Sequence, residues 1–507
     1  MPPSSGITAA TLLERAQARA DAGQYAAALA DLEAAHTLSP GDASVALARA
    51  QCLGALGRFT PSADAARKAI ALSPDLADAH CALGFALEQL GELEQARAAY
   101  ETALRLDTGL AEAAARLSAL AARRADWPQT RLLAERALAL APGHAAARTA
   151  LIMADMGQGR VAEAEASARA LAGDPAYLPQ VRAAARTLLA DALDRQDRAG
   201  EAFAAYSDAN RTLRELHRDQ FGRPGSPSGS ATARRLLAEF ESLGEPARAE
   251  PGTEPDRPHV FILGFPRSGT TLLAEILAGH PGARVMDERN LLGDALAQFT
   301  ARPGGLTPLM KAGPSSLADL RARYWERAAQ AGAGAGLVID KSPFHSLHLP
   351  VIARLFPSAH ILFALRDPRD AVFACFRRLF ALNAFLYECL TLEGAAALYD
   401  AVMRLSALYR ARLPLNLLEV RNEDVIAGPE DEVGRICHFL GIAPNPAMTD
   451  FAGRESRRGI ASPQSASLAG GVSAASRGQW RRYAGEMAPV LPLLAPWVRR
   501  FGYEDAA

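Results

Sequence analysis

One short segment of the sequence combines two glycines, a cation and several hydroxyl side chains. An apolar run, 259–263, leads into Gly264-Phe-Pro-Arg-Ser-Gly-Thr-Thr, and a helical pattern follows directly. A glycine-rich turn at a helix N-terminus can bind phosphate, because its backbone N–H groups point at the ligand. The segment therefore predicts a site for a phosphate-like anion, with the candidate contacts Arg267, Ser268, Gly269, Thr270 and Thr271.

This loop differs from the P-loop of nucleotide hydrolases at one position. In the pattern G-x-x-x-x-G-K-S/T, the lysine reaches the β- and γ-phosphates and the next hydroxyl binds Mg²⁺. Here Thr270 stands in place of the lysine, and Arg267 lies inside the loop instead. A P-loop kinase for a small metabolite remains an alternative, but the replacement favours an anionic group shorter than a triphosphate.

A second cluster of charge follows another apolar run, 360–365. Arg366 and Asp367 come directly after it, and the helical pattern that follows carries Arg378. Open parallel sheets bind ligands at the carboxyl ends of their strands, and a guanidinium can hold a phosphate through two parallel hydrogen bonds. Arg366 is therefore a candidate phosphate ligand.

Taken together, these segments resemble the sulfotransferases that use 3′-phosphoadenosine 5′-phosphosulfate, and among them the tyrosylprotein-sulfotransferase-like branch. Pro266-Arg-Ser-Gly-Thr-Thr resembles the family's 5′-phosphosulfate loop, and Leu365-Arg-Asp resembles the segment that binds the 3′-phosphate. The resemblance implies this donor as co-substrate, with no metal, and a hydroxyl as acceptor. The family's serine on the following helix is replaced here by Ala374, so one hydroxyl donor is absent. Either Arg366 together with Arg378 compensates at the 3′-phosphate, or the affinity for the donor is reduced.

The same resemblance implies residues for the transfer itself, which needs a base for the acceptor hydroxyl and a cation at the leaving oxygen. The family's catalytic glutamate falls at Glu288, with Asp287 beside it as the alternative. Its catalytic lysine, in a Lys-x-Pro-Phe setting, falls at Lys341, and Arg267 neutralises the transferring group. Histidine as the base is a further alternative, at His280, His345 or His348.

Two later segments extend the resemblance toward the C-terminus. A serine that contacts the transferring group falls at Ser462 or, less directly, Ser465. Ser476-Arg477-Gly478-Gln-Trp resembles the loop that closes over the nucleotide, so Arg477 and the Gly478 backbone are candidate phosphate contacts. By contrast, Val420-Arg-Asn-Glu-Asp-Val is interpreted as structural.

The composition supports one of these assignments independently. Among 55 basic residues only Lys68, Lys311 and Lys341 are lysines, so a lysine directly after an apolar run indicates a site that needs a compact ammonium. With 56 acidic residues the net charge is −1, which argues against a generic nucleic-acid binder.

The N-terminal part of the chain repeats itself every 34 residues. Small residues, bulky residues two positions later, alanines and prolines each recur in register, which is what a helix–turn–helix unit needs. This resembles the tetratricopeptide repeat, with a degenerate further unit near 196–213, and implies a peptide or protein partner on the concave face. The registers are Gly23, Gly57, Gly91, Ala125 and Gly159; Tyr25, Phe59, Leu93, Trp127 and Val161; Ala35, Ala69, Ala103 and Ala137; and Pro40, Pro74, Thr108 and Pro142.

We therefore predict a multidomain protein: an all-α tetratricopeptide solenoid at 8–215, a linker at 216–257 and a P-loop-like α/β sulfotransferase domain at 258–505. The linker is rich in Gly, Pro and Ser and holds a short helical stretch around 234–243. Beyond it, short apolar runs alternate with helical patterns, which predicts a largely parallel sheet. The predicted strands are 259–264, 337–340, 360–365 and 416–420.

The remaining composition bounds the setting. Five scattered cysteines without a C-x-x-C pair argue against a zinc site and a disulfide framework, and no uncharged apolar run approaches the ~20 residues of a spanning helix. We expect a cytoplasmic protein. A third possibility, besides sulfotransferase and kinase, is a non-catalytic scaffold whose enzyme domain has degenerated, and Ala374 is the feature that favours it.

Overall fold

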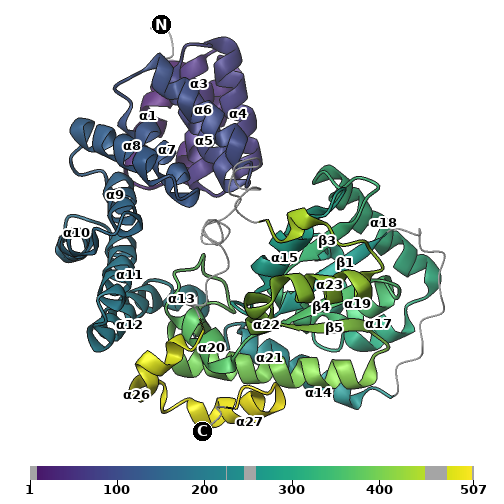
Figure 1. Cartoon of the computed structure of the whole chain (residues 1–507). Helices are drawn as coiled ribbons and strands as arrows, with labels where there is room; N and C mark the ends of the chain where they lie inside the picture. Colours follow the sequence, from purple (N-terminus) through teal and green to yellow (C-terminus); the bar gives the residue numbers. More distant parts are fainter. Residues whose placement is uncertain (1–7, 224, 245–257, 451–476, 505–507) are drawn as a thin grey trace, which may run out of the picture. The chain divides into compact units, whose positions relative to one another are not determined.

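The computed structural model describes residues 8–223, 225–244, 258–450 and 477–504. By its internal contacts the chain separates into two compact units, Met1–Ala168 and Arg169–Ala507. Figure 1 shows both, and each unit is described here by itself.

The first unit is a series of antiparallel helix pairs joined by tight turns. The turn residue is left-handed in every pair, with φ of 72° to 82° at the glycines Gly57 and Gly91, for example, and 54° at Ala125. The bulky residue of each register is the first residue of the second helix. The helices are α1 Ala9–Asp21, α2 Tyr25–Leu38, α3 Ala43–Ala55, α4 Phe59–Leu72, α5 Ala77–Gln89, α6 Leu93–Leu106, α7 Ala111–Arg123, α8 Trp127–Leu140, α9 Ala145–Gly157 and α10 Val161–Gly173, which continues into the second unit.

Small residues let these helices approach one another closely. Ala35, Ala69, Ala103 and Ala137, one each in α2, α4, α6 and α8, are fully buried. The predicted solenoid is therefore confirmed, with each register in the role that its residue type suggested. Close packing also explains Gly84, since a Cβ there would lie 2.7 Å from the ring of Tyr100.

One more helix pair follows, and it belongs to the second unit. α11 (Pro179–Arg195) and α12 (Ala199–Leu216) are joined at Asp197, whose φ of 62° matches the turns of the repeats. α11 has 17 residues where α9 has 13, which adds about one helical turn. Ala183 and Leu213 of this pair pack on Leu390, far along the chain. The predicted array, 8–215, thus extends past the division between the two units.

A five-stranded parallel sheet forms the centre of the second unit. The strand order is β2-β3-β1-β4-β5, with Val260 opposite Ile339 on one side and His360 on the other. β1 is buried throughout and the outer strands only in part, as expected for a sheet covered by helices on both faces. The strands are β1 His259–Gly264, β2 Arg284–Asp287, β3 Val338–Lys341, β4 His360–Leu365 and β5 Asn416–Arg421.

Four of these strands match the predicted ones to within a residue at each end, and the parallel sheet is confirmed. β2 differs, because no strand was expected there. It has four residues, ends in charged side chains and lies at the sheet edge, so it lacks the apolar run that identifies the other strands.

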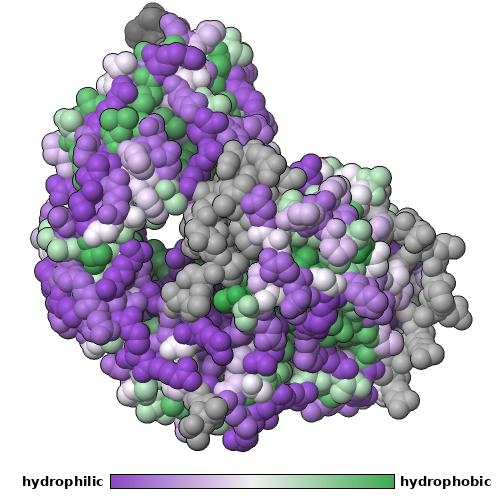
Figure 2. All heavy atoms as spheres, in the orientation of Figure 1, coloured by the Kyte–Doolittle hydropathy of each residue, from purple (hydrophilic) through white to green (hydrophobic). Residues whose placement is uncertain are grey.

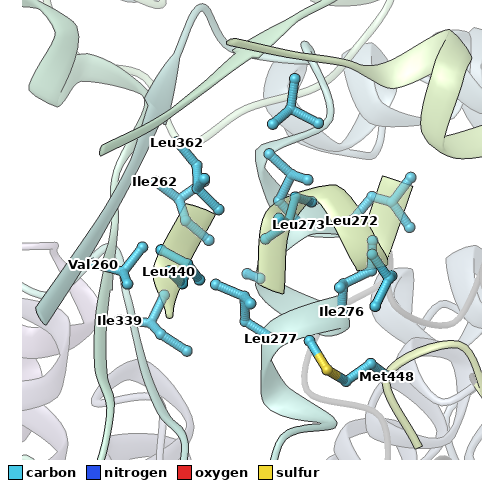
Figure 3. Packing of buried hydrophobic residues seen from close by; sticks show 14 of the residues in the cluster. Val260, Ile262, Leu272, Leu273, Ile276, Leu277, Ile339, Leu362, Leu440 and Met448 are labelled. Atoms are coloured by element: carbon cyan, nitrogen blue, oxygen red, sulfur yellow. The ribbon is translucent and has the colours of Figure 1, made fainter. Parts of the chain in front are cut away.

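Helices on both faces complete the second unit. α15 (Thr270–Ala278) and α23 (Pro429–Leu440) pack on one face, where Leu273, Leu277 and Leu440 meet Ile262 and Ile339 (Figure 3). The other helices of this unit are α13 Arg218–Phe221, α14 Gly229–Ser242, α16 Gly293–Phe299, α17 Leu306–Lys311, α18 Pro314–Gln330, α19 Leu349–Leu355, α20 Pro368–Phe376, α21 Leu392–Arg412, α22 Asn422–Ala427, α26 Ala484–Met487 and α27 Leu491–Arg500, with 3-10 turns η1 Pro343–Leu347, η2 Glu388–Leu390, η3 Pro446–Met448 and η5 Gln479–Tyr483.

Part of the predicted linker is a packed helix. α14 buries Ala233, Leu236 and Phe240, which share one helix face, and the Phe240 ring lies edge-on to Tyr409 at 4.7 Å between centroids. The helix begins earlier than the short stretch expected from the sequence. Its first residues were not predicted to be helical, because they lie in a segment rich in Gly and Ser.

The visible surface carries no single dominant apolar face. Figure 2 shows hydrophilic side chains over most of this view, interrupted by separate hydrophobic patches. Within the described ranges, none of the helices combines the length and the hydropathy that crossing a membrane requires.

Candidate active site

The candidate residues meet because all five strands run in the same direction. Their carboxyl ends lie along one edge of the sheet, where β1 leads into the glycine loop, β3 ends at Lys341 and β4 leads into Arg366. After β1 the chain turns toward β2, and after β4 it turns toward β5 on the opposite side. Open α/β sheets bind ligands at the point where the connections that leave two neighbouring parallel strands go to opposite sides of the sheet.

The glycine loop passes close to neighbouring backbone and side chains. A Cβ at Gly264 would lie 2.5 Å from the carbonyl oxygen of Ala364, and one at Gly269 would lie 2.6 Å from Oδ1 of Asn422. Gly269 has φ 98° and precedes the first residue of α15, so the loop ends at a helix N-terminus with unpaired N–H groups. Ser268 and Thr270 are buried within this loop.

Backbone strain is concentrated at the same edge. Among the described residues, four that are not glycine have positive φ: Ala125 and Asp197 in turns of the repeats, and Arg267 (67°) and Glu288 (52°) here. Left-handed conformations of such residues are costly and tend to persist where function requires them. The strain therefore marks two residues that were assigned to the site on other grounds.

Arginines surround the glycine loop without enough carboxylates to balance them. Arg366 donates from Nη1 to the carbonyl oxygen of Arg267 at 3.1 Å. Burial, and then repulsion from Arg378 and Arg366, lowers the pKa of Arg267 to about 10. Within the part of the chain that the structure describes, the guanidinium groups of Arg267 and Arg378 make no ion pair or hydrogen bond, and Nε of Arg267 is buried. This is an environment suited to an anion.

Lys341 is held by two acidic residues from the neighbouring strand. Asp287 lies opposite Lys341 in the ladder, and the ammonium pairs with Asp287 and, at 2.9 Å, with Oε1 of Glu288. Lys341 is 3% exposed whereas Glu288 is 61% exposed, so the lysine is fixed and the glutamate faces solvent. Burial alone would lower the pKa of Lys341, but the charges of Asp287 and Glu288 outweigh it and raise the pKa. Lys341 therefore stays protonated.

His345, one of the three histidines considered as alternative bases, is held by a buried carboxylate. His345 Nε2 lies 3.2 Å from Oδ1 of Asp340, which is fully buried and also accepts a hydrogen bond from Tyr324. Burial lowers the pKa of His348 to about 3. Asp340 precedes Lys341 on β3, so its side chain points to the opposite face of the sheet from the lysine.

A buried carboxylate fixes the segment that follows residue 476. Asp370, 1% exposed, accepts hydrogen bonds from the N–H groups of Gly478 at 2.6 Å and Trp480 at 3.0 Å. The guanidinium of Arg369 lies 4.2 Å from the Trp480 ring. Gly478 thus already donates its N–H to Asp370, while Arg477 is exposed. The sequence motif contained Asp370 but gave it no role.

The segment 420–425, which the sequence analysis interpreted as structural, holds neighbouring backbone in place. Glu423 is buried and accepts hydrogen bonds from the N–H of Asp367 at 3.1 Å and from the hydroxyl of Tyr503 at 2.7 Å. It therefore fixes the backbone directly after Arg366.

The structure brings most of the predicted residues together. At the sheet edge lie Arg267, Ser268, Gly269, Thr270, Thr271, Glu288, Lys341 and Arg366, with Arg378 one residue past the C-cap of α20. Ser462 and Ser465 lie outside the described residues. Ala374 is buried in α20 and leaves no hydroxyl at its position. In the described ranges, no group of three or more His, Cys, Asp or Glu residues could hold a metal ion.

Two segments of the chain match known protein families. Residues 258–446 match the sulfotransferase family and residues 77–110 match the tetratricopeptide repeat. Protein-tyrosine sulfotransferase 2 of Gallus gallus is 29% identical over 201 residues, 37% of this chain and 52% of that protein. Nodulation protein NoeE of Sinorhizobium fredii is 31% identical over 222 residues, 38% of this chain and 52% of that protein.

Among solved structures, the sulfotransferase domain from the curacin biosynthetic pathway aligns with 17% identity and a TM-score of 0.29, covering 46% of this chain and 99% of that one. The chain spans about half the length of the first two curated relatives that it matches.

Proposed function

We propose that the protein transfers a sulfonate group from 3′-phosphoadenosine 5′-phosphosulfate to a hydroxyl group, which is supported by the match of residues 258–446 to the sulfotransferase family. The observation that carries this proposal is the cluster of arginines at the glycine loop. Arg267 and Arg378 have no carboxylate partner among the described residues, and burial, followed by repulsion from Arg378 and Arg366, lowers the pKa of Arg267. A donor with phosphate groups at both ends would relieve that repulsion.

The donor-binding roles follow from position. Arg267 and the N–H groups at the start of α15 bind the 5′-phosphosulfate, with the hydroxyls of Ser268, Thr270 and Thr271 beside them. Arg366, with Arg378, binds the 3′-phosphate, and Arg477 closes over the nucleotide. The N–H of Gly478 is not available to the nucleotide, because it already donates to Asp370. Gly478 therefore contributes to this loop only through its backbone conformation.

Glu288 and Lys341 carry the transfer. Glu288 takes the proton of the acceptor hydroxyl as the new S–O bond forms, and Lys341 donates a hydrogen bond to the bridging oxygen as the old S–O bond breaks. Their contact of 2.9 Å places base and cation next to each other at the carboxyl ends of β2 and β3. A positioned base contributes ~10²- to 10⁴-fold in rate. Asp287 anchors Lys341, and Ser462 is a further candidate contact to the transferring group.

The acceptor and the partner of the repeats are the open part of this proposal. A protein tyrosine, a carbohydrate and a small metabolite are all hydroxyl acceptors, and the repeats would recruit the acceptor or a partner protein. A reducing, cytoplasmic location fits the five cysteines, which are all buried free thiols.

The test is binding of adenosine 3′,5′-bisphosphate, the desulfonated product. We expect it to raise the melting temperature of the wild-type protein and expect Arg366→Ala to abolish that rise. Arg412→Ala is the matched control: among the described residues, Arg412 donates to the carbonyl oxygens of Phe240, Leu243 and Gly244 and lies over the Phe240 ring, so its loss should lower stability but preserve the shift. A wild-type protein stabilised by ATP with Mg²⁺ and not by the bisphosphate would contradict the proposal and favour the kinase alternative. Sulfonate turnover on any acceptor would exclude the non-catalytic scaffold.

A further inference from the structure

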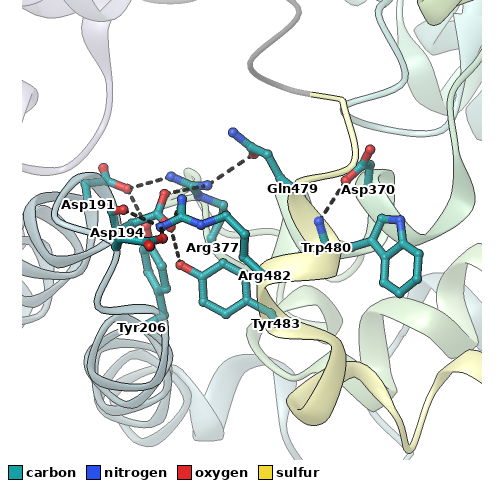
Figure 4. Close-up of polar contacts among 10 residues, drawn as sticks. Asp191, Asp194, Tyr206, Asp370, Arg377, Gln479, Trp480, Arg482 and Tyr483 are labelled. Atoms are coloured by element: carbon teal, nitrogen blue, oxygen red, sulfur yellow. Dashed lines mark hydrogen bonds and ion pairs between the residues drawn. The ribbon is translucent and has the colours of Figure 1, made fainter.

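Three acidic residues at the end of α11 face the enzyme domain within the second unit. Asp191 pairs with Arg377 at 3.1 Å, and Asp194 pairs with Arg377 at 3.4 Å and with Arg482 at 2.9 Å. Asp197 also pairs with Arg482, at 2.8 Å. Figure 4 shows these contacts converging from α11 on one side and from α20 and η5 on the other.

Asp194 is the centre of this cluster. Its side chain is only 9% exposed and accepts a hydrogen bond from the hydroxyl of Tyr483 in addition to its two arginine partners. Arg377 comes directly after α20, whereas Arg482 and Tyr483 belong to η5. One carboxylate of the last helix pair therefore joins two segments that are more than 100 residues apart in the sequence.

Those two segments are the ones that carry the outer donor ligands. α20 begins two residues after Arg366, and η5 begins directly after Gly478. At the inner end, Asp370 of α20 holds the N–H groups of Gly478 and Trp480. At the outer end, Asp194 holds Arg377 and Tyr483, and the Tyr483 ring packs on Phe373 of α20 at 4.2 Å between centroids. The two segments are thus fastened to each other at both ends.

The acidic residues of α11 also bind one of the arginines near the glycine loop and not the others. Arg377 directly precedes Arg378, and, after burial, its charge is among those that lower the pKa of Arg267. It is nevertheless occupied, by Asp191, Asp194 and Oε1 of Gln479 at 3.2 Å. Arg267 and Arg378 have no such partner among the described residues. The α11 carboxylates therefore bind Arg377, whereas Arg267 and Arg378 stay available for the ligand.

We propose that Asp194, on the last helix pair of the repeat region, is a positioning residue for donor binding: it holds α20 and η5 in the arrangement that presents Arg366 and Arg477 to the 3′-phosphate end of the nucleotide. This rests on the proposed function. It makes α11 and α12 a working part of the enzyme, although their sequence pattern is that of the repeats.

The test compares Asp194→Asn with Asp155→Asn in the full chain. Asp155 is a matched control, since it is a buried aspartate near the end of α9 that pairs with Arg131 and Arg160 in the first unit. Because Asn keeps the shape and loses the charge, we expect Asp194→Asn to weaken adenosine 3′,5′-bisphosphate binding about tenfold. Asp155→Asn should lower stability and leave that dissociation constant unchanged.

A split between kinetic constants separates positioning from simple destabilisation. Asp194→Asn should raise KM for the sulfonate donor and leave KM for the acceptor unchanged, whereas a smaller folded fraction lowers only the apparent kcat. If Asp194→Asn does not fold, Tyr483→Phe serves instead, because it removes one hydrogen bond and keeps the ring packing; we expect about threefold weaker binding.

Each outcome decides the inference. Weaker nucleotide binding by Asp194→Asn or Tyr483→Phe, but not by Asp155→Asn, supports it. Unchanged binding by folded Asp194→Asn overturns the positioning role and leaves the proposed function standing. A wild-type protein that does not bind the bisphosphate overturns both.

Discussion

The two units of this chain are stabilised by contacts of different range. In the first unit, each helix pair repeats the same turn, the same buried alanine and the same bulky first residue, so every contact is made within a pair or with the next one. In the second unit, Arg267, Lys341 and Arg366 come from the ends of three strands, and Asp194 holds residues almost 300 positions away. A substitution should therefore act locally in the first unit and on distant groups in the second.

The largest contrast should come from two lysines. Lys341→Ala removes the cation at the leaving oxygen and leaves Asp287 and Glu288 without their shared partner, so we expect the transfer rate to fall by about 10²- to 10³-fold. Lys68→Ala in the first unit removes only a contact of 3.1 Å with His36 and should leave the rate unchanged. The measurement is the initial rate of label transfer from radiolabelled donor. Equal losses in the two variants would contradict the division of roles.

The same exchange of glycine for alanine should have different consequences in the two units. At Gly84 the new Cβ would press on the Tyr100 ring, which should cost about 1–3 kcal/mol of stability without changing nucleotide affinity. At Gly269 it would meet Asn422 in a left-handed backbone at the anion site, so adenosine bisphosphate binding should be lost. Denaturant titration and calorimetry measure the two effects. Retained binding by Gly269→Ala would argue against the loop as the donor site.

The pH dependence of the second unit should show the contribution of His348. Burial lowers its folded-state pKa to about 3, below the usual value of about 6.5, so the unfolded chain takes up the proton first. One such proton reduces the free energy of unfolding by up to ~1.4 kcal/mol for each pH unit as the pH falls from about 6.5 toward 3.

His348→Asn should remove that component and keep a residue suited to precede α19. Hydrogen exchange of β1 amides against pH measures it, with α5 amides of the first unit as an internal control. Parallel curves for wild type and variant in β1 would refute the expectation.

The smallest effect should be a gain in stability. Ala125 occupies the turn position that is glycine in the neighbouring pairs and has φ 54°, so Ala125→Gly should relieve strain and stabilise the first unit by about 0.5–1 kcal/mol. Asp197→Gly should not gain as much, because Asp197 also pairs with Arg482. Thermal unfolding compares the two. A destabilised Ala125→Gly would show that the turn tolerates alanine without strain.

The difference between contacts that are close in the sequence and contacts that are far apart also explains which features could be predicted from the sequence. Turns, buried alanines and helix starts recur at a fixed spacing, so their roles in the first unit followed from the spacing alone. The central strands are continuous apolar runs, and the glycine loop is a local motif, so both were predicted with their boundaries. Lys341, Glu288 and Arg366 followed from a resemblance, and the parallel strand order explains why they meet.

Other features depend on partners that are distant in the sequence. β2 is a short polar strand, and its pairing is visible only once β3 lies beside it. Asp370, Asp191 and Asp194 resemble ordinary helix-surface acids, because their partners lie in segments far along the chain. The hydrogen bond that holds His345 depends in the same way on Asp340 and Tyr324 being buried together.

The contacts between the acidic residues at the end of α11 and the residues of η5 also affect the order in which parts of the chain can fold during synthesis. Contacts of high sequence separation form late, because the loop they close is long, whereas neighbouring repeats can fold as they leave the ribosome. We therefore expect the first unit to be folded while the acids of α11 still lack Arg482 and Tyr483. The second unit can be completed only when the chain has been made as far as Tyr503, whose hydroxyl bonds to Glu423.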